Sequence, residues 1–79
     1  MTMVDARGEW AGRASRFLKA ELKRAAVTYE DLARRLAEQG IIETKGSVSV
    51  KVNRGAYPAW FFFAAMKAIG KSDVFILEV

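Results

Sequence analysis

The chain has 79 residues, 52% of them hydrophobic, which suits one packed domain spanning residues 1–79 and argues against disorder. It has no Cys and no His, which excludes disulfides, thiolate or imidazole metal ligands and the commonest general base. The net charge is +4, from 13 basic and 9 acidic residues. We therefore expect no cofactor and no metal, and the composition gives little support to an enzyme.

Residues 5–26 are predicted to form a first helix. Their apolar side chains recur at steps of three and four, which places them on one helical face. These positions are Trp10, Ala14, Phe17, Leu18, Leu22 and Ala25. Glu9 and Arg13 add a favourable i,i+4 ion pair on the polar side.

A second helix is predicted over residues 28–39. Thr28 is a good N-cap, and Asp31 three positions later completes a pattern similar to a capping box. The acidic residues of this first turn also suit the positive end of the helix dipole. Gly40 is placed to end the helix, because glycine adopts positive φ without strain.

The third segment supports two readings. Residues 47–52 alternate Ser or Lys with Val, and this periodicity alone predicts a β-strand. A helix would instead bury Val48 and Val52 as an i,i+4 pair and turn Val50 partly outward. The setting favours a helix over residues 44–54, because the segment follows a capped helix, ends in Asn-Arg-Gly and precedes another helix.

A fourth helix is predicted over residues 58–69, with Pro58 in its first turn. It is apolar around most of its circumference, so we expect it to be buried or to lie in an interface. Tyr57 is the one aromatic residue there that we place on the surface. The apolar run over residues 59–66 is too short to cross a bilayer, which needs about 20 residues.

Residues 73–79 read as a short C-terminal β-strand of apolar and β-branched residues. A single strand beside four helices would have an open edge, which proteins normally cover. Pairing with the same strand of a second copy would give a homodimer. The alternative is that this segment packs over the helices.

Four short motifs together resemble a small bacterial helix-turn-helix-like family of unknown function, over about residues 10–70. These motifs are Leu18-Lys19-x-Glu21-Leu22, Val27-Thr28-Tyr29-x-Asp31-Leu32-Ala33-x-Arg35-Leu36, Val52-Asn53-Arg54-Gly55 and Phe62-Phe63-x3-Lys67-Ala68-Ile69-Gly70. More distantly, the chain resembles the lambda-repressor-like (Xre-type) DNA-binding domains. This resemblance implies a mainly all-α, four-helix helix-turn-helix domain with a recognition helix at about residues 44–54. The connection over residues 38–46 is longer than the usual turn of about four residues.

Residues 44–72 contain five basic residues and no acid, and such a field attracts a polyanion. A solvated basic face is the alternative. The candidate DNA contacts are Thr44, Lys45, Ser47, Ser49, Lys51 and Arg54, with Thr28 and Tyr29 at the start of the second helix. For Lys45, Lys51 and Arg54 we favour DNA contact, since no acid lies nearby in the sequence. For Thr28 and Tyr29 we favour a cap and a hydrophobic contact.

The sequence therefore predicts a sequence-specific protein that binds double-stranded DNA, a small bacterial or phage-type transcriptional regulator acting as a homodimer through residues 73–79. No targeting signal is visible, and the absence of Cys fits the cytoplasm. The alternative is a protein–protein interaction module, an adaptor or an antitoxin-like partner. That module would use the aromatic helix and the C-terminal strand without binding DNA.

Overall fold

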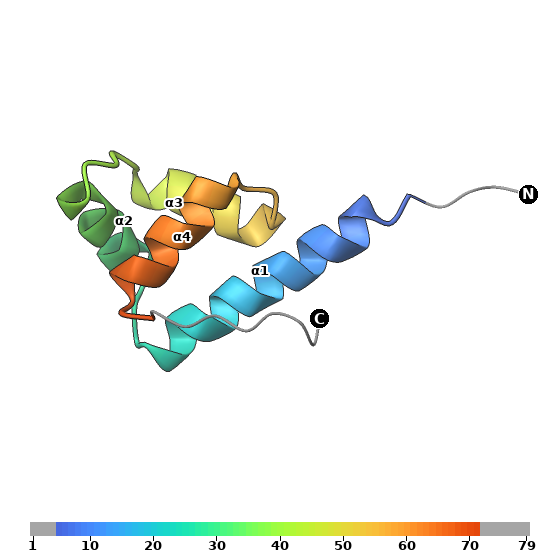
Figure 1. The fold of residues 1–79 in the computed structure, drawn as a ribbon, viewed down its shortest axis with the longest axis horizontal. Helices are drawn as coiled ribbons and strands as arrows, with labels where there is room; N and C mark the ends of the chain where they lie inside the picture. The colour runs from blue at the N-terminus through green and yellow to red at the C-terminus, as the bar shows by residue number, and fades with distance from the viewer. Residues whose placement is uncertain (1–4, 72–79) are drawn as a thin grey trace, which may run out of the picture.

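The computed structural model describes residues 5–71, which form four helices and no strand. The helices are α1 (Arg7–Arg24), α2 (Tyr29–Glu38), α3 (Lys45–Arg54) and α4 (Ala59–Ala68), shown in Figure 1. The prediction of four helices is confirmed, and each observed helix lies within its predicted range. The strand expected at residues 73–79 lies outside the described residues.

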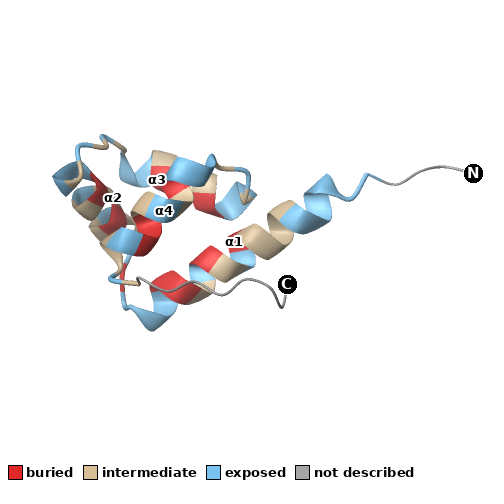
Figure 2. Cartoon of the chain, viewed as in Figure 1, coloured by how far each residue is buried: buried red, intermediate tan, exposed pale blue. Residues whose placement is uncertain are grey.

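The three short helices pack together beside the long helix α1 (Figure 1). Helix α2 contacts α3 and α4, and α1 contacts α3. Figure 2 colours the buried residues, which lie from the middle of α1 to its C-terminal end and on the three short helices, whereas the first turn of α1 is exposed. The hydrophobic core consists of Leu18, Leu22, Val27, Leu32, Leu36, Val48, Val52, Phe61, Ala65 and Met66. Among the described residues, no helix combines the length and apolar character needed to cross a membrane.

Helix α3 settles the choice between strand and helix in the third segment. Val48 and Val52 are fully buried, while Val50 is 50% exposed. Thr44 caps the start, where its Oγ accepts a hydrogen bond of 3.0 Å from the Ser47 amide. A strand would turn all three valines to one face, whereas the helix buries the two that belong to the core.

Gly55 ends α3 and lets that helix approach α1 closely. Its φ of +65° lies in the left-handed region that favours glycine. A Cβ atom there would lie 1.8 Å from the carbonyl oxygen of Ala11 and 2.9 Å from the amide nitrogen of Ser15. No other residue type fits this contact without moving one helix, so Gly55 fixes how α3 sits against α1.

The connection between α2 and α3 runs over residues 39–44, six residues in place of the nine expected. It is shorter because Glu38 still belongs to α2, and Lys45 and Gly46 already belong to α3. The Gln39 side chain donates a hydrogen bond of 2.9 Å to the carbonyl oxygen of Ala64, which ties this connection to α4. It is still longer than the turn of about four residues in a helix-turn-helix.

The aromatic residues of α4 divide between the core and the surface. Phe61 is fully buried, but Trp60 is 52% exposed and Phe63 is 69% exposed. Tyr57 is half-buried and its hydroxyl donates a hydrogen bond of 3.2 Å to the Ala14 carbonyl. The expectation that Tyr57 is the surface aromatic of this region is therefore wrong, because packing against α1 covers it.

Candidate nucleic-acid interface

One flank of α3 faces α2 and carries Lys45, Ser49 and Asn53, which recur at i,i+4 spacing. The Asn53 side-chain amide donates a hydrogen bond of 2.8 Å to the Ser49 carbonyl and lies 3.5 Å from the Tyr29 hydroxyl. Lys45 and Asn53 are exposed, and Ser49 and Tyr29 are partly buried. Three of the predicted site residues, Tyr29, Lys45 and Ser49, thus lie on one surface.

The other flank of α3 carries Ser47 and Lys51, which turn towards Glu43. The Lys51 ammonium lies 2.8 Å from the Glu43 carboxylate, and the Ser47 hydroxyl donates a hydrogen bond to that carboxylate. The Lys51 ammonium also lies 5.9 Å from the centre of the Phe61 ring. Hydrogen bonds from Lys51 and Ser47 hold the pKa of Glu43 below its ordinary value. The expectation that no acid lies near Lys51 is wrong, because Glu43 comes just before the acid-free stretch of residues 44–72.

A shallow depression brings Lys45 together with two lysines of α1, Lys19 and Lys23. It has a volume of about 360 Å³, and Thr28 and Tyr29 also line it. None of the three lysines has an ion-pair partner within residues 5–71. Lys19 and Lys23 were not predicted as site residues from the sequence, although their i,i+4 spacing places them on one polar face. Only the packing of α1 against α3 shows that this face adjoins Lys45.

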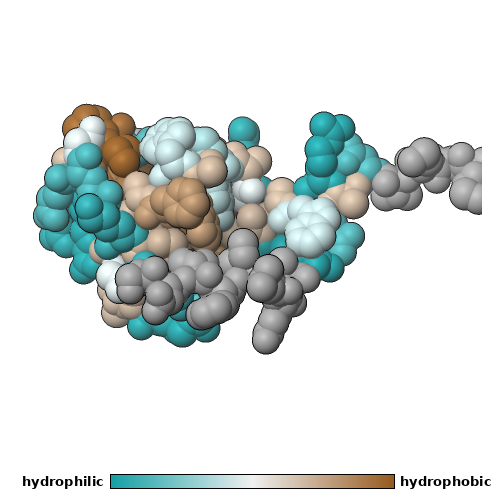
Figure 3. All heavy atoms as spheres, viewed as in Figure 1, coloured by the Kyte–Doolittle hydropathy of each residue, from teal (hydrophilic) through white to brown (hydrophobic). Residues whose placement is uncertain are grey.

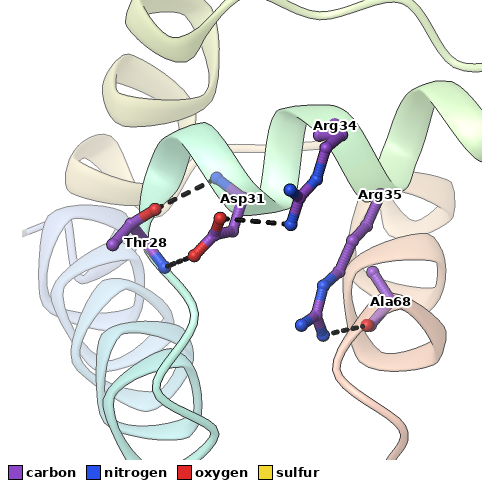
Figure 4. Close-up of polar contacts among 5 residues, drawn as sticks. All are labelled: Thr28, Asp31, Arg34, Arg35 and Ala68. Atoms are coloured by element: carbon purple, nitrogen blue, oxygen red, sulfur yellow. Dashed lines mark hydrogen bonds and ion pairs between the residues drawn. The ribbon is translucent and has the colours of Figure 1, made fainter.

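The start of α2 is closed by a capping box (Figure 4). The Thr28 hydroxyl accepts a hydrogen bond of 3.0 Å from the Asp31 amide, and the Thr28 amide donates one of 3.2 Å to the Asp31 carboxylate. These hydrogen bonds from Thr28 lower the pKa of Asp31, and Arg34 pairs with the same carboxylate at 3.2 Å. The prediction that Thr28 caps the helix is confirmed. A carboxylate at this helix end also disfavours a second anion there.

The start of α3 differs from the start of α2 because its first turn contains no acidic residue. The Glu43 carboxylate lies just before this turn, where it accepts a hydrogen bond from the Ser47 hydroxyl and pairs with Lys51. Gly46 is exposed, and a Cβ atom built on it would meet only the Thr44 hydroxyl, at 3.9 Å. The Thr44 cap uses the Ser47 amide, so the amides of Lys45 and Gly46 are the two in this turn that make no hydrogen bond among the described residues, and the helix dipole adds positive potential beside Lys45.

The basic window over residues 44–72 is partly neutralised by acids from other parts of the chain. Lys51 pairs with Glu43, and Lys71 pairs with the buried Glu21 of α1 at 3.0 Å. Arg54 is exposed at the end of α3, and no ion pair engages it within the described residues. The positive potential of this window is thus concentrated on fewer groups than its composition suggests.

Between residues 5 and 71, no group of three or more acidic side chains is arranged to hold a metal ion. The described residues form four helices, and their lysine cluster beside the start of α3 has no ion-pair partner among them. Residues 10–74 match the family described as Domain of unknown function (DUF6471), and the chain belongs to that family. Comparisons with curated proteins and with solved structures gave no match.

Proposed function

We propose that this protein binds double-stranded DNA in the manner of a lambda-repressor-like (Xre-type) helix-turn-helix domain. In this proposal it is a small bacterial or phage-type transcriptional regulator that works as a homodimer in the cytoplasm. The observation that carries the proposal is the cluster of Lys19, Lys23 and Lys45 beside the start of α3. Lysines without acidic partners keep their charge available for phosphates, whose neutralisation supplies most of the affinity of proteins for DNA.

The docking that fits this surface places α3 in the major groove. An α-helix with its side chains is about 10–12 Å in diameter, which the groove, about 12 Å wide, admits. Lys45 would enter first, with Ser49 and Asn53 behind it on the same flank, since their side chains bond either bases or phosphates. Lys19 and Lys23 would reach the adjoining phosphates. Ser47 and Lys51 are left out of this contact set, because Glu43 already engages both.

The test is fluorescence anisotropy of a labelled mixed-sequence duplex across a salt series. Each lost phosphate contact reduces the slope of log K against log salt by about 0.9. We expect the variant Lys19→Ala, Lys23→Ala, Lys45→Ala to lower that slope by about 2 to 3 and to keep its helical circular dichroism. Lys67→Ala is the matched control for Lys45→Ala. Both lysines are exposed and have no ion-pair partner within residues 5–71, but Lys67 lies outside the cluster.

Two results would reject the proposal: no binding at low salt, or equal effects of Lys45→Ala and Lys67→Ala. Binding that depends on the cluster would lead next to selection of a preferred sequence from a random pool. Variants of Ser49 and Asn53 would then be compared on the selected site and on mixed sequence. A role in base recognition predicts a larger loss on the selected site.

A protein–protein interaction module, adaptor or antitoxin-like, is the second candidate function. It is favoured by the exposure of Trp60 and Phe63, since large aromatic side chains are enriched at protein interfaces. In this case the lysine cluster would be a solvated face, and the protein would bind no duplex even at low salt.

A further inference from the structure

An apolar groove lies between the N-terminal half of α1 and the start of α4. It has a volume of about 320 Å³. Its walls include Trp10, Ala14 and Phe17 on one side and Tyr57, Phe62 and Phe63 on the other. Figure 3 shows tan and brown apolar surface on the side of the molecule where α4 lies.

Large aromatic side chains project at the rim of this groove. Phe63 is 69% exposed and Trp10 is 52% exposed, although both also line the groove. Trp60, three residues before Phe63 on α4, is 52% exposed. Single exposed apolar residues are ordinary, but three large rings beside an apolar hollow form a patch that usually marks an interaction site.

We propose that a second copy of this chain covers the groove, so that the protein self-associates through the aromatic surface formed by Trp10, Trp60, Phe63 and the groove. A projecting ring and a hollow that accepts a ring lie on the same patch. A two-fold contact requires such a self-complementary surface, because each copy must offer what the other one receives. Phe63 of each copy would enter the groove of the other.

The exposed aromatic area supplies part of a dimer interface. A Trp or Phe side chain buries about 150–250 Å² when fully covered. The exposed fractions of Trp10, Trp60 and Phe63 therefore leave on the order of 350 Å² of aromatic surface on each copy. Covering it on both copies would remove roughly 700 Å² from water, about half of what a specific interface buries in total. The remaining area would have to come from residues around the groove, so the aromatic surface alone supports a weak association.

The charges near the groove do not oppose a second copy. Among residues 5–71, Arg13 is the one charged residue that lines it. Its guanidinium lies 3.0 Å from the Glu9 carboxylate and 4.7 Å from the centre of the Trp10 ring. This pairing limits the repulsion expected between two chains of net charge +4. Lys67 lies one turn beyond Phe63 and is exposed, so it would stay solvated at the rim.

The groove and the lysine cluster lie on opposite flanks of α1. Successive helical residues are about 100° apart, so Lys19 points roughly 160° away from Phe17. Association through the groove would therefore leave Lys19 and Lys23 facing solvent. The inference goes beyond DNA binding. It also places the dimer contact within residues 10–63 rather than at residues 73–79.

The test is sedimentation equilibrium of the full chain without DNA, over a range of concentrations. We expect a monomer–dimer equilibrium that Phe63→Glu shifts by at least tenfold towards monomer. Ile42→Glu is the matched control, because Ile42 is 85% exposed on the connection between α2 and α3, outside the groove. Ile76→Glu interrupts the apolar run of residues 73–79 and should leave the equilibrium unchanged.

Tryptophan fluorescence gives a second readout, because the chain's two tryptophans, Trp10 and Trp60, both belong to this surface. Their emission should shift to shorter wavelength, and their quenching by acrylamide should fall, as the concentration rises. Phe63→Ser repeats the test with a smaller change, and circular dichroism checks the fold of every variant.

The inference is overturned if the chain stays monomeric at all concentrations, or if Phe63→Glu acts no more strongly than Ile42→Glu. It is also overturned if Ile76→Glu alone dissociates the dimer, since the contact would then lie in the C-terminal segment. DNA binding is measured separately, so loss of association with an unchanged salt slope per chain would leave the proposed function standing.

Discussion

The close approach of α3 to α1 predicts that Gly55→Ala is among the most destabilising substitutions in this protein. Two costs combine at this position. An alanine in the left-handed region costs about 1–2 kcal/mol. Its Cβ would also lie 1.8 Å from the Ala11 carbonyl oxygen, a backbone atom that cannot swing aside, so one helix must shift. Forced overpacking of this kind costs about 1–3 kcal/mol.

The expected loss is therefore about 2–5 kcal/mol, against a total of about 5 kcal/mol for a domain of this size. Urea unfolding followed by circular dichroism at 222 nm measures it. With a slope near 1 kcal/mol per molar urea, the midpoint should fall by about 2 M or more. The loss should appear in the midpoint and not in the slope, because the surface exposed on unfolding is nearly unchanged.

Gly40→Ala is the matched control that separates the backbone cost of Gly55→Ala from its steric cost. Gly40 has a φ of +83°, but a Cβ atom there meets nothing within 4 Å. It should therefore show the backbone cost alone, about 1–2 kcal/mol. If Gly55→Ala and Gly40→Ala lower the urea midpoint equally, the close contact between Gly55 and α1 adds nothing to the free energy of unfolding, and the prediction is refuted.

Two further predictions concern stability. Ala26 has a φ of +56° and is exposed after the end of α1, so Ala26→Gly should raise the unfolding free energy by about 0.5–1 kcal/mol, measured by the urea midpoint. A lowered or unchanged midpoint would contradict this. Hydrogen bonds from Arg24 and Lys71 hold the pKa of the buried Glu21 below its ordinary value of 4.5. Its stabilising contribution is therefore complete above pH 4.5 and is lost as the pH falls further. Glu21→Gln should cost about 1 kcal/mol at pH 7 and less at pH 3; equal losses at both would refute this.

Local signals in the sequence predicted α1, α2 and α4, and α2 has the fullest boundary chemistry. Thr28 accepts a hydrogen bond from the amide three residues later, and this cap is readable from residue type and spacing. Thr44 caps α3 in the same way, whereas from the sequence it was predicted only as a DNA contact. Gly40 and Gly55 both take positive φ after their helices. Such effects act within one turn, so they need no knowledge of the rest of the fold.

Helix α3 shows where local signals fail. The alternation of Val48, Val50 and Val52 satisfies a strand and a helix at once, and β-branched residues favour the strand. The helix forms because burial of Val48 and Val52 against α1 and α2 outweighs the preference of the segment itself. The expectation of an acid-free surface near Lys51 was wrong for a similar reason. Glu43, which pairs with Lys51, lies eight residues earlier and outside the acid-free stretch of residues 44–72.

The sequence by itself determined the positions of α1, α2 and α4, the Thr28 cap and the excess of basic over acidic side chains. Only the tertiary structure decided which charges are paired and which flanks meet. Lys71 pairs with Glu21, which lies 50 positions earlier in the chain. Lys45 of α3 lines the same depression as Lys19 and Lys23 of α1. The physical reason is that periodicity fixes the rotation of a side chain about its own helix axis. How one helix packs on another depends on contacts such as that of Gly55 with α1, which no local pattern contains.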